Sequence, residues 1–173
     1  MKEYVKIPLE RVAVVIGQNG GVKELIEEKS MTSLNIDSQT GDVEIDIKDP
    51  IKGMRTKEVV NAIARGFSPE KAFLLFDKDL LMFETIDLSN IAKTEKDLER
   101  IKGRIIGSTG KTRDVFENLT GAHISVYGKT VSFIGYPEQN TVVRAGIDMI
   151  LKGSIQKVVY KFLEKKAGEL KME

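Results

Sequence analysis

Residues 105–110 read Ile-Ile-Gly-Ser-Thr-Gly, and residues 15–20, 90 positions earlier, read Val-Ile-Gly-Gln-Asn-Gly. The similarity continues at the same offset, because the alternation of Leu34 and Ile36 returns at Ile124 and Val126. Further on, the second copy is two or three residues shorter, since Pro50 matches Pro137 at an offset of 87. The sequence therefore predicts a duplicated unit of about 85 residues, so that the chain contains two copies of one fold.

The first copy predicts the order strand, helix, helix, strand, strand, helix. Apolar periodicity sets the type of each element, and Gly17, Gly41 and Gly66 mark helix ends and a turn. The expected elements are a strand over 4–7, helices over 9–16 and from residue 20, strands over 33–37 and 42–48, and a helix over 55–65.

The second copy repeats this order and adds a tail helix. The expected elements are a strand over 81–87, helices over 95–106 and 111–119, strands over 123–127 and 130–134, and a helix over 137–152. A short connector helix between the copies is expected to begin at Ser68-Pro69-Glu70. After Gly153, Ser154 is expected to cap a tail helix with an apolar stripe at Ile155, Val158, Val159, Phe162 and Leu163, opposite Lys157, Lys161, Lys165 and Lys166. We expect this stripe to pack in the core, with a partner-binding face as the alternative. We expect one domain over 1–78, with the connector helix, and a second over 79–173, with the tail helix.

A Gly-x-x-Gly loop between two helices has a physical use. Glycine lets a phosphodiester approach the backbone without meeting a Cβ atom, and the helix that follows points N–H groups at phosphate oxygens. The run from Gly107 to Thr112 contains Gly-Lys-Thr, but Ile105 stands where a nucleotide-binding P-loop requires glycine, and the loop follows a helix instead of a strand. A purely structural role, in which each Gly-x-x-Gly is only a helix C-cap followed by a turn, is the alternative. It accounts for a single loop more readily than for two loops in the same helix–loop–helix context.

Both loops resemble the Ile-Gly-x-x-Gly of the K-homology (KH) domain, which clamps about four nucleotides of single-stranded nucleic acid. The second copy adds Thr-Gly-Ala-His-Ile over 120–124, which is similar to the family sequence that leads into the second strand. The resemblance implies an α+β fold of two tandem type I KH domains (β-α-α-β-β-α). Each would have a three-stranded antiparallel sheet with helices packed on one face, and a C-terminal helix would follow.

One position departs from the usual KH sequence and indicates a particular group within the KH family. KH domains commonly place an apolar residue three positions after the second glycine, where this chain has Lys23 and Arg113. These positions are either a solvated helix face or cations that reach the bound strand. The basic residue and the second-copy sequence from Arg104 through Phe133 resemble the KH-type small-subunit ribosome assembly factors, in their archaeal form. One protein of that family partners the endonuclease that matures the rRNA 3′ end.

That resemblance implies binding of single-stranded RNA, namely small-subunit rRNA near its 3′ end during ribosome assembly. It also implies other ribosome-assembly proteins or translation factors as partners. The residues themselves contain no convincing catalytic constellation, so we expect no catalytic residue, metal or cofactor. Three alternatives stay open: a protein-interaction scaffold with vestigial KH units, a KH protein that acts on mRNA or tRNA, and an RNA-processing enzyme.

Charge distinguishes the two copies although the net charge is only +1. Residues 1–84 hold 12 Lys plus Arg and 15 Asp plus Glu, net −3, whereas residues 85–173 hold 15 and 11, net +4. Seven cations lie between Lys93 and Arg113, against three acids, and this stretch contains the second loop. A basic helix leading into a phosphate clamp suits single-stranded nucleic acid, so we expect the second copy to dominate binding.

The expected RNA-binding residues are the two loops, their flanking cations and aliphatic side chains on which bases would lie. They are Gly107, Ser108, Thr109, Gly110, Lys111, Arg113, Lys102, Arg104, Ile105, Ile106 and Ile124 in the second copy, and Gly17, Gln18, Asn19, Gly20 and Lys23 in the first.

Composition excludes several chemistries. The chain has no Cys and one His, so disulfides, thiolate nucleophiles and multi-histidine metal sites are excluded. His123 is expected to be structural, with a hydrogen bond to a base as the alternative. The acids at 42, 44, 46 and 49 are expected to form a solvent face, with a metal or a basic partner as the alternative. No apolar run suits a signal peptide or a membrane span, and we expect a cytoplasmic protein.

Overall fold

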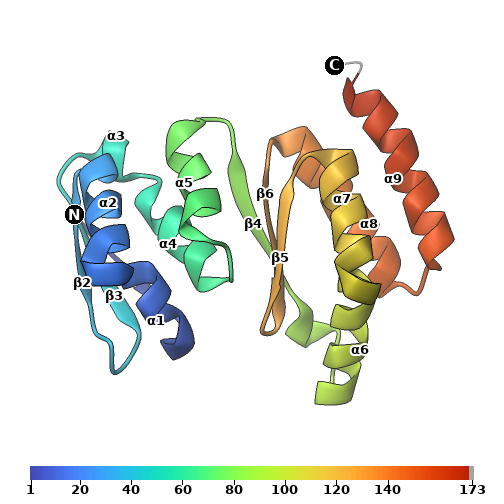
Figure 1. Cartoon of the computed structure of the whole chain (residues 1–173), viewed down its shortest axis with the longest axis horizontal. Coiled ribbons are helices and arrows are strands. Elements are labelled where there is room, and N and C mark those ends of the chain that lie inside the picture. Colours follow the sequence, from blue (N-terminus) through green and yellow to red (C-terminus); the bar gives the residue numbers. More distant parts are fainter. Residues whose placement is uncertain (172–173) are drawn as a thin grey trace. The chain divides into compact units, whose positions relative to one another are not determined.

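The computed structural model describes residues 1–171 and forms two compact units. The first unit spans Met1–Asp79, and the second begins at Leu80. Each unit contains a three-stranded antiparallel sheet in which the third strand of the sequence lies at the centre. Within each unit the helices cover one face of the sheet (Figure 1). The α+β fold and the strand–helix–helix–strand–strand–helix order expected from the sequence are confirmed.

The first unit buries one side of its central strand. Its elements are β1 (Lys2–Lys6), α1 (Leu9–Ile16), α2 (Gly21–Ser30), β2 (Thr32–Ile36), β3 (Asp42–Ile47), α3 (Pro50–Gly53), α4 (Thr56–Ala64) and α5 (Pro69–Asp77). In β3 the apolar residues Val43, Ile45 and Ile47 are at most 6% exposed and alternate with acids. A strand has a side-chain period of two, so this alternation fixes which face packs under the helices.

The second unit repeats the arrangement with larger core residues. Its elements are β4 (Met82–Asp87), α6 (Glu95–Ile106), α7 (Lys111–Thr120), β5 (His123–Tyr127), β6 (Thr130–Gly135), α8 (Pro137–Leu151) and α9 (Gln156–Lys171). Phe116 of α7, Phe133 of β6 and Ile147 of α8 are fully buried in one cluster. Each such side chain contributes about 1.5–3 kcal/mol relative to an exposed one.

The two units share hydrogen bonds as well as topology. The carboxylate of Glu27 in α2 accepts a hydrogen bond of 2.8 Å from the backbone N–H of Leu34 in β2. Glu117 in α7 accepts the same bond, also of 2.8 Å, from Ile124 in β5. Both pairs keep the offset of 90, so the duplication seen in the sequence extends to individual contacts.

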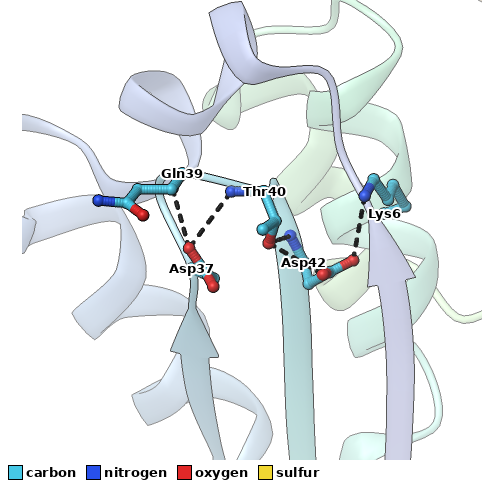
Figure 2. A network of polar contacts seen from close by, with 5 residues as sticks. All are labelled: Lys6, Asp37, Gln39, Thr40 and Asp42. Atoms are coloured by element: carbon cyan, nitrogen blue, oxygen red, sulfur yellow. Dashed lines mark hydrogen bonds and ion pairs between the residues drawn. The ribbon is translucent and has the colours of Figure 1, made fainter.

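A polar network closes the turn between β2 and β3 (Figure 2). The Asp37 carboxylate accepts hydrogen bonds from the backbone N–H groups of Gln39, at 2.9 Å, and Thr40, at 3.2 Å. These bonds favour the ionised form and hold the pKa of Asp37 below its ordinary value. The Thr40 hydroxyl donates to Asp42 at 2.9 Å, and Lys6 of β1 lies 3.5 Å from the same carboxylate.

Local partners account for three of the four acids expected on a solvent face. Asp42 belongs to the turn network, and Glu44 forms an ion pair of 2.9 Å with Lys2. The hydrogen bond to Glu44 raises the pKa of Lys2 above its ordinary value. Asp49 accepts hydrogen bonds from the backbone N–H groups of Ile51 and Lys52. Within residues 1–171 no group of three or more His, Asp or Glu side chains is arranged to hold a metal ion.

Outside the two Gly-x-x-Gly loops, α3 and a 3₁₀ turn that follows β4 were not predicted from the sequence. Asp49 and Pro50 form an N-cap and first helical position for α3, the same pair of signals that predicted α5 from Ser68 and Pro69. A 3₁₀ turn over Leu88–Asn90 follows β4, with Asp87 as its cap. Both elements are shorter than two helical turns, so neither has the apolar periodicity that marks a longer helix.

The residues that α9 buries differ from those expected on its core face. Val159, Leu163 and Ala167 of α9 are at most 5% exposed, whereas Ile155 and Val158 are 64% and 46% exposed. The buried residues follow each other at intervals of four, and Ile155 precedes the first residue of the helix. The expectation of Ile155 and Val158 in the core was therefore wrong. In the part of the chain that the structure describes, no helix is long and apolar enough to cross a membrane.

Candidate nucleic-acid interface

The two Gly-x-x-Gly loops have the same backbone geometry. Gly107 has φ 78° and ψ 173°, and Gly17 has φ 77° and ψ 174°. The third loop residue lies in the left-handed region in both units, with φ 53° at Thr109 and φ 55° at Asn19. A β-branched residue such as threonine is an outlier there, and strained backbone of this kind concentrates at functional sites.

The first glycine of each loop is required by close packing. A Cβ atom on Gly107 would lie 2.4 Å from Thr112 Oγ1 and 2.7 Å from the Thr112 backbone nitrogen. A Cβ atom on Gly17 would lie 2.4 Å from Val22 Cγ2. Each loop is therefore pressed onto the first turn of the helix that follows it, α7 or α2.

The second loop presents polar groups at the positive end of a helix dipole. Ser108 and Thr109 are exposed immediately before α7 begins at Lys111. A helix N-terminus attracts anions through its N–H groups and its dipole. This arrangement can hold a phosphate of an extended strand.

The predicted cations near the second loop differ in how exposed they are and in whether an acidic side chain already pairs with them. Lys111 is exposed and forms no ion pair with a described residue, whereas Arg113 lies 3.9 Å from Asp114. The Lys102 side chain is 20% exposed and lies 3.9 Å from Glu99. Among these three cations, Lys111 therefore has the fewest competing partners in the described chain.

Arg104 makes intramolecular hydrogen bonds. Its guanidinium donates to the carbonyl of Ile150 in α8, at 2.8 Å, and to the carbonyl of Ser154, which lies between α8 and α9. The charge of Arg104 remains close to the loop, but the side chain is directed toward α8. Its first role in this structure is to join α6 to α8.

The three aliphatic residues expected to carry bases are placed differently from one another. Ile105 and Ile124 are 1% and 6% exposed and belong to the core of the second unit. The side chain of Ile106 is only half-buried. A base cannot lie on a side chain that the core encloses, so Ile106 is the one of the three that we keep in the candidate interface.

The first loop is flanked by fewer cations than the second. Gln18 and Asn19 are exposed, and Lys23 is half-buried in α2 beside Glu24. Arg11 donates to the carbonyls of Ile63, at 2.8 Å, and Phe67, at 3.0 Å. The geometry of the clamp is present in the first unit, but the electrostatic support for an anion is weaker.

The sequence analysis missed a polar link between the second loop and the tail helix. The Thr112 hydroxyl, which touches Gly107, lies 3.0 Å from the Tyr160 hydroxyl and 3.2 Å from Gln156 Nε2. Gln156 and Tyr160 stand four residues apart, so they share one face of α9. That spacing was the available signal in the sequence.

Comparisons with known proteins agree with this geometry. A family model described as the eukaryotic-type KH domain (KH-domain type I) matches residues 82–168. The KH domain-containing protein MJ0443 of Methanocaldococcus jannaschii is 39% identical over 173 residues, which cover 98% of this chain and 75% of that protein. The Pre-rRNA-processing protein PNO1 of Chaetomium thermophilum is 31% identical over 116 residues, which cover 66% of this chain and 45% of that protein.

A solved structure extends the similarity over nearly the whole chain. A chain from the a/eIF2alpha–aDim2p–rRNA complex of Pyrococcus horikoshii OT3 has a TM-score of 0.90 and 41% sequence identity. The match covers 98% of this chain and 95% of that chain. The two structures therefore share both units, whereas the chain spans less than half the length of the Chaetomium PNO1 protein.

Proposed function

We propose that this chain, which belongs to the PNO1-type family of type I KH-domain proteins, binds single-stranded ribosomal RNA. The loop over 107–110 clamps the phosphodiester backbone, and the first KH unit contributes the weaker contact through its loop over 17–20. The proposed role is binding, and we assign no catalytic step to any residue.

The observation that carries the proposal is the second loop together with its charge. Gly107 packs tightly on Thr112 and leaves Ser108 and Thr109 exposed at the N-terminus of α7. Beside them lies Lys111, which forms no ion pair with any residue of the described range 1–171. Single-stranded nucleic acid needs a positively charged groove that follows its backbone. The remaining predicted contacts, Lys102, Arg113 and Ile106, belong to α6 and α7, the helices on either side of this loop.

Ribosomal RNA is favoured as the target by the relatives. PNO1 is named a pre-rRNA-processing protein, and the aDim2p structure is a complex with rRNA. We propose that the bound segment lies near the 3′ end of the small-subunit rRNA and that binding occurs in the cytoplasm during ribosome assembly. The same complex contains a/eIF2alpha, so we propose a translation initiation factor as a protein partner.

Crosslinking in cells, followed by sequencing of the bound RNA, tests the target directly. We expect reads concentrated near the 3′ end of the small-subunit rRNA. Reads spread over mRNA or tRNA would identify a different RNA target. An absence of crosslinked RNA, together with binding to single strands that does not respond to salt, would favour a protein scaffold instead.

A further inference from the structure

A small polar pocket lies beside the second loop, where α6, α7 and α9 meet. Its volume is about 260 Å³, and its lining includes Arg104, Gly107, Ser108, Thr112, Gln156 and Tyr160. Pockets for drug-sized ligands measure roughly 300–1,000 Å³, so this one suits a smaller group. Gly107 and Ser108 belong to both the loop and the pocket, so a strand held by the loop would pass the rim of the pocket.

Three side chains of the pocket form a hydrogen-bonded triad. Gln156 Nε2 lies 2.7 Å from the Tyr160 hydroxyl oxygen and 3.2 Å from Thr112 Oγ1, and the two hydroxyl oxygens lie 3.0 Å apart. The amide supplies hydrogens for two of these contacts, and one hydroxyl supplies the third. The hydrogen of the other hydroxyl is not used within the triad, so the triad can donate one further hydrogen bond to a ligand.

Further polar groups of the pocket are also unused within residues 1–171. The Gln156 amide oxygen accepts no hydrogen bond there, and the Ser108 hydroxyl takes part in none. Arg104 keeps its positive charge at the wall while two of its nitrogens bind the carbonyls of Ile150 and Ser154. The pocket thus offers two hydroxyl donors, one amide acceptor and one positive charge.

The first unit has no such chemistry at the corresponding position. Val22 stands where Thr112 stands in the repeat, and it packs in the same way against the first glycine of its loop. Valine and threonine have nearly the same shape, so packing alone does not require the hydroxyl. The polar triad distinguishes the unit that also carries the basic loop.

We propose that this pocket binds the ribose and phosphate of one nucleotide of the RNA strand that the loop clamps, an inference that rests on the proposed function. The phosphate oxygens accept hydrogen bonds from Ser108 and from the spare hydroxyl of the triad, next to the charge of Arg104. The ribose 2′-hydroxyl donates to the Gln156 amide oxygen. Because the 2′-hydroxyl separates RNA from DNA, the pocket makes the second KH unit selective for RNA.

The test measures binding of the full chain to an oligoribonucleotide with the 3′-end sequence of small-subunit rRNA. A series of the same oligomer carries a single 2′-deoxy nucleotide at each position in turn. We expect one position at which the deoxy substitution weakens binding roughly fivefold, the effect of one hydrogen bond. In the Gln156→Leu variant the unmodified RNA binds roughly fivefold more weakly, and the deoxy substitution at that position has no further effect.

Gln39→Leu is the matched control, because it makes the same chemical change at an exposed turn of the first unit and should keep the deoxy effect. A uniform response to deoxy substitution along the oligomer overturns the pocket assignment, and so does a Gln156→Leu variant that keeps the effect. In both cases binding to RNA would persist, and the proposed function with it. If the unaltered chain does not bind the oligomer, the proposed function itself fails.

Discussion

Arg104 donates a hydrogen bond of 2.8 Å to the carbonyl of Ile150, which lies 46 residues further along the chain. Arg11 donates a bond of the same length to the carbonyl of Ile63. The two acceptors are 87 positions apart and correspond in the repeat, but the two donors are 93 positions apart and do not. Since α1 and α6 correspond at an offset of 90, the arginine has shifted by three residues, one helical turn on the same face. The two units conserve the interaction and not the residue position.

This relationship predicts that Arg104→Leu destabilises the second unit. The substitution leaves the carbonyls of Ile150 and Ser154 without their charged donor, which we expect to lower the free energy of unfolding by about 2–3 kcal/mol. Urea unfolding monitored by circular dichroism measures the change. Arg100→Leu is the control, because the Arg100 side chain is 61% exposed and its ion pair with Asp97 spans 3.7 Å. Equal stabilities for the two variants would contradict a structural role for Arg104.

The two glycines of the second loop should respond differently to alanine. Gly107→Ala places a Cβ atom 2.4 Å from Thr112 Oγ1, so we expect a loss of several kcal/mol or failure to fold. Gly110→Ala meets only the flexible end of Arg113, at 3.0 Å, so its cost is the left-handed backbone alone, about 1–2 kcal/mol. Thermal unfolding ranks the two variants. A Gly110→Ala variant as unstable as Gly107→Ala would contradict the packing argument.

Lys111 should contribute to RNA binding through a phosphate contact. In a plot of log K against log salt concentration, Lys111→Ala is expected to reduce the slope by about 0.7, the value for one phosphate contact on a single strand. Lys71→Ala, a change at an exposed lysine of α5, should leave the slope unchanged. An unaltered slope in the Lys111 variant would remove this residue from the interface.

The turn between β2 and β3 should weaken in acid. Since the backbone N–H groups of Gln39 and Thr40 lower the pKa of Asp37, ionised Asp37 stabilises the folded state above the pKa of the unfolded chain, about 3.9. That stabilisation is lost as the pH falls through the lower, folded pKa. We therefore expect the unaltered chain to be more stable than Asp37→Asn at neutral pH. Unfolding curves at several pH values should show this difference shrinking below about pH 4. A constant difference would contradict the assignment.

The sequence allowed the topology and the clamp to be predicted because both depend on local patterns. The alternation of Val43, Ile45 and Ile47 with acids specifies a half-buried strand by itself. The glycines of each loop specify a backbone that few other residues can adopt. Because the unit is duplicated, these local patterns occur in both copies, and each copy supports the prediction made for the other.

The remaining features depend on contacts between distant residues. The triad joins Thr112 to Gln156 and Tyr160 across 44 and 48 positions, and no short-range pattern reports such a pair. Burial of Ile105 and Ile124 depends on how α6 and β5 pack into one core, which the resemblance alone did not specify.

The central claim, that the second loop clamps an RNA phosphate, is tested most directly by comparing Thr109→Asn with Thr109→Asp. Asparagine occupies this position in the first loop with nearly the same angles, and both substituents tolerate the left-handed region better than threonine. The two variants differ only in a negative charge next to the bound strand. We predict that Thr109→Asn keeps the affinity for the rRNA 3′-end oligomer, whereas Thr109→Asp weakens it roughly tenfold or more. Equal dissociation constants for the two folded variants would contradict the claim.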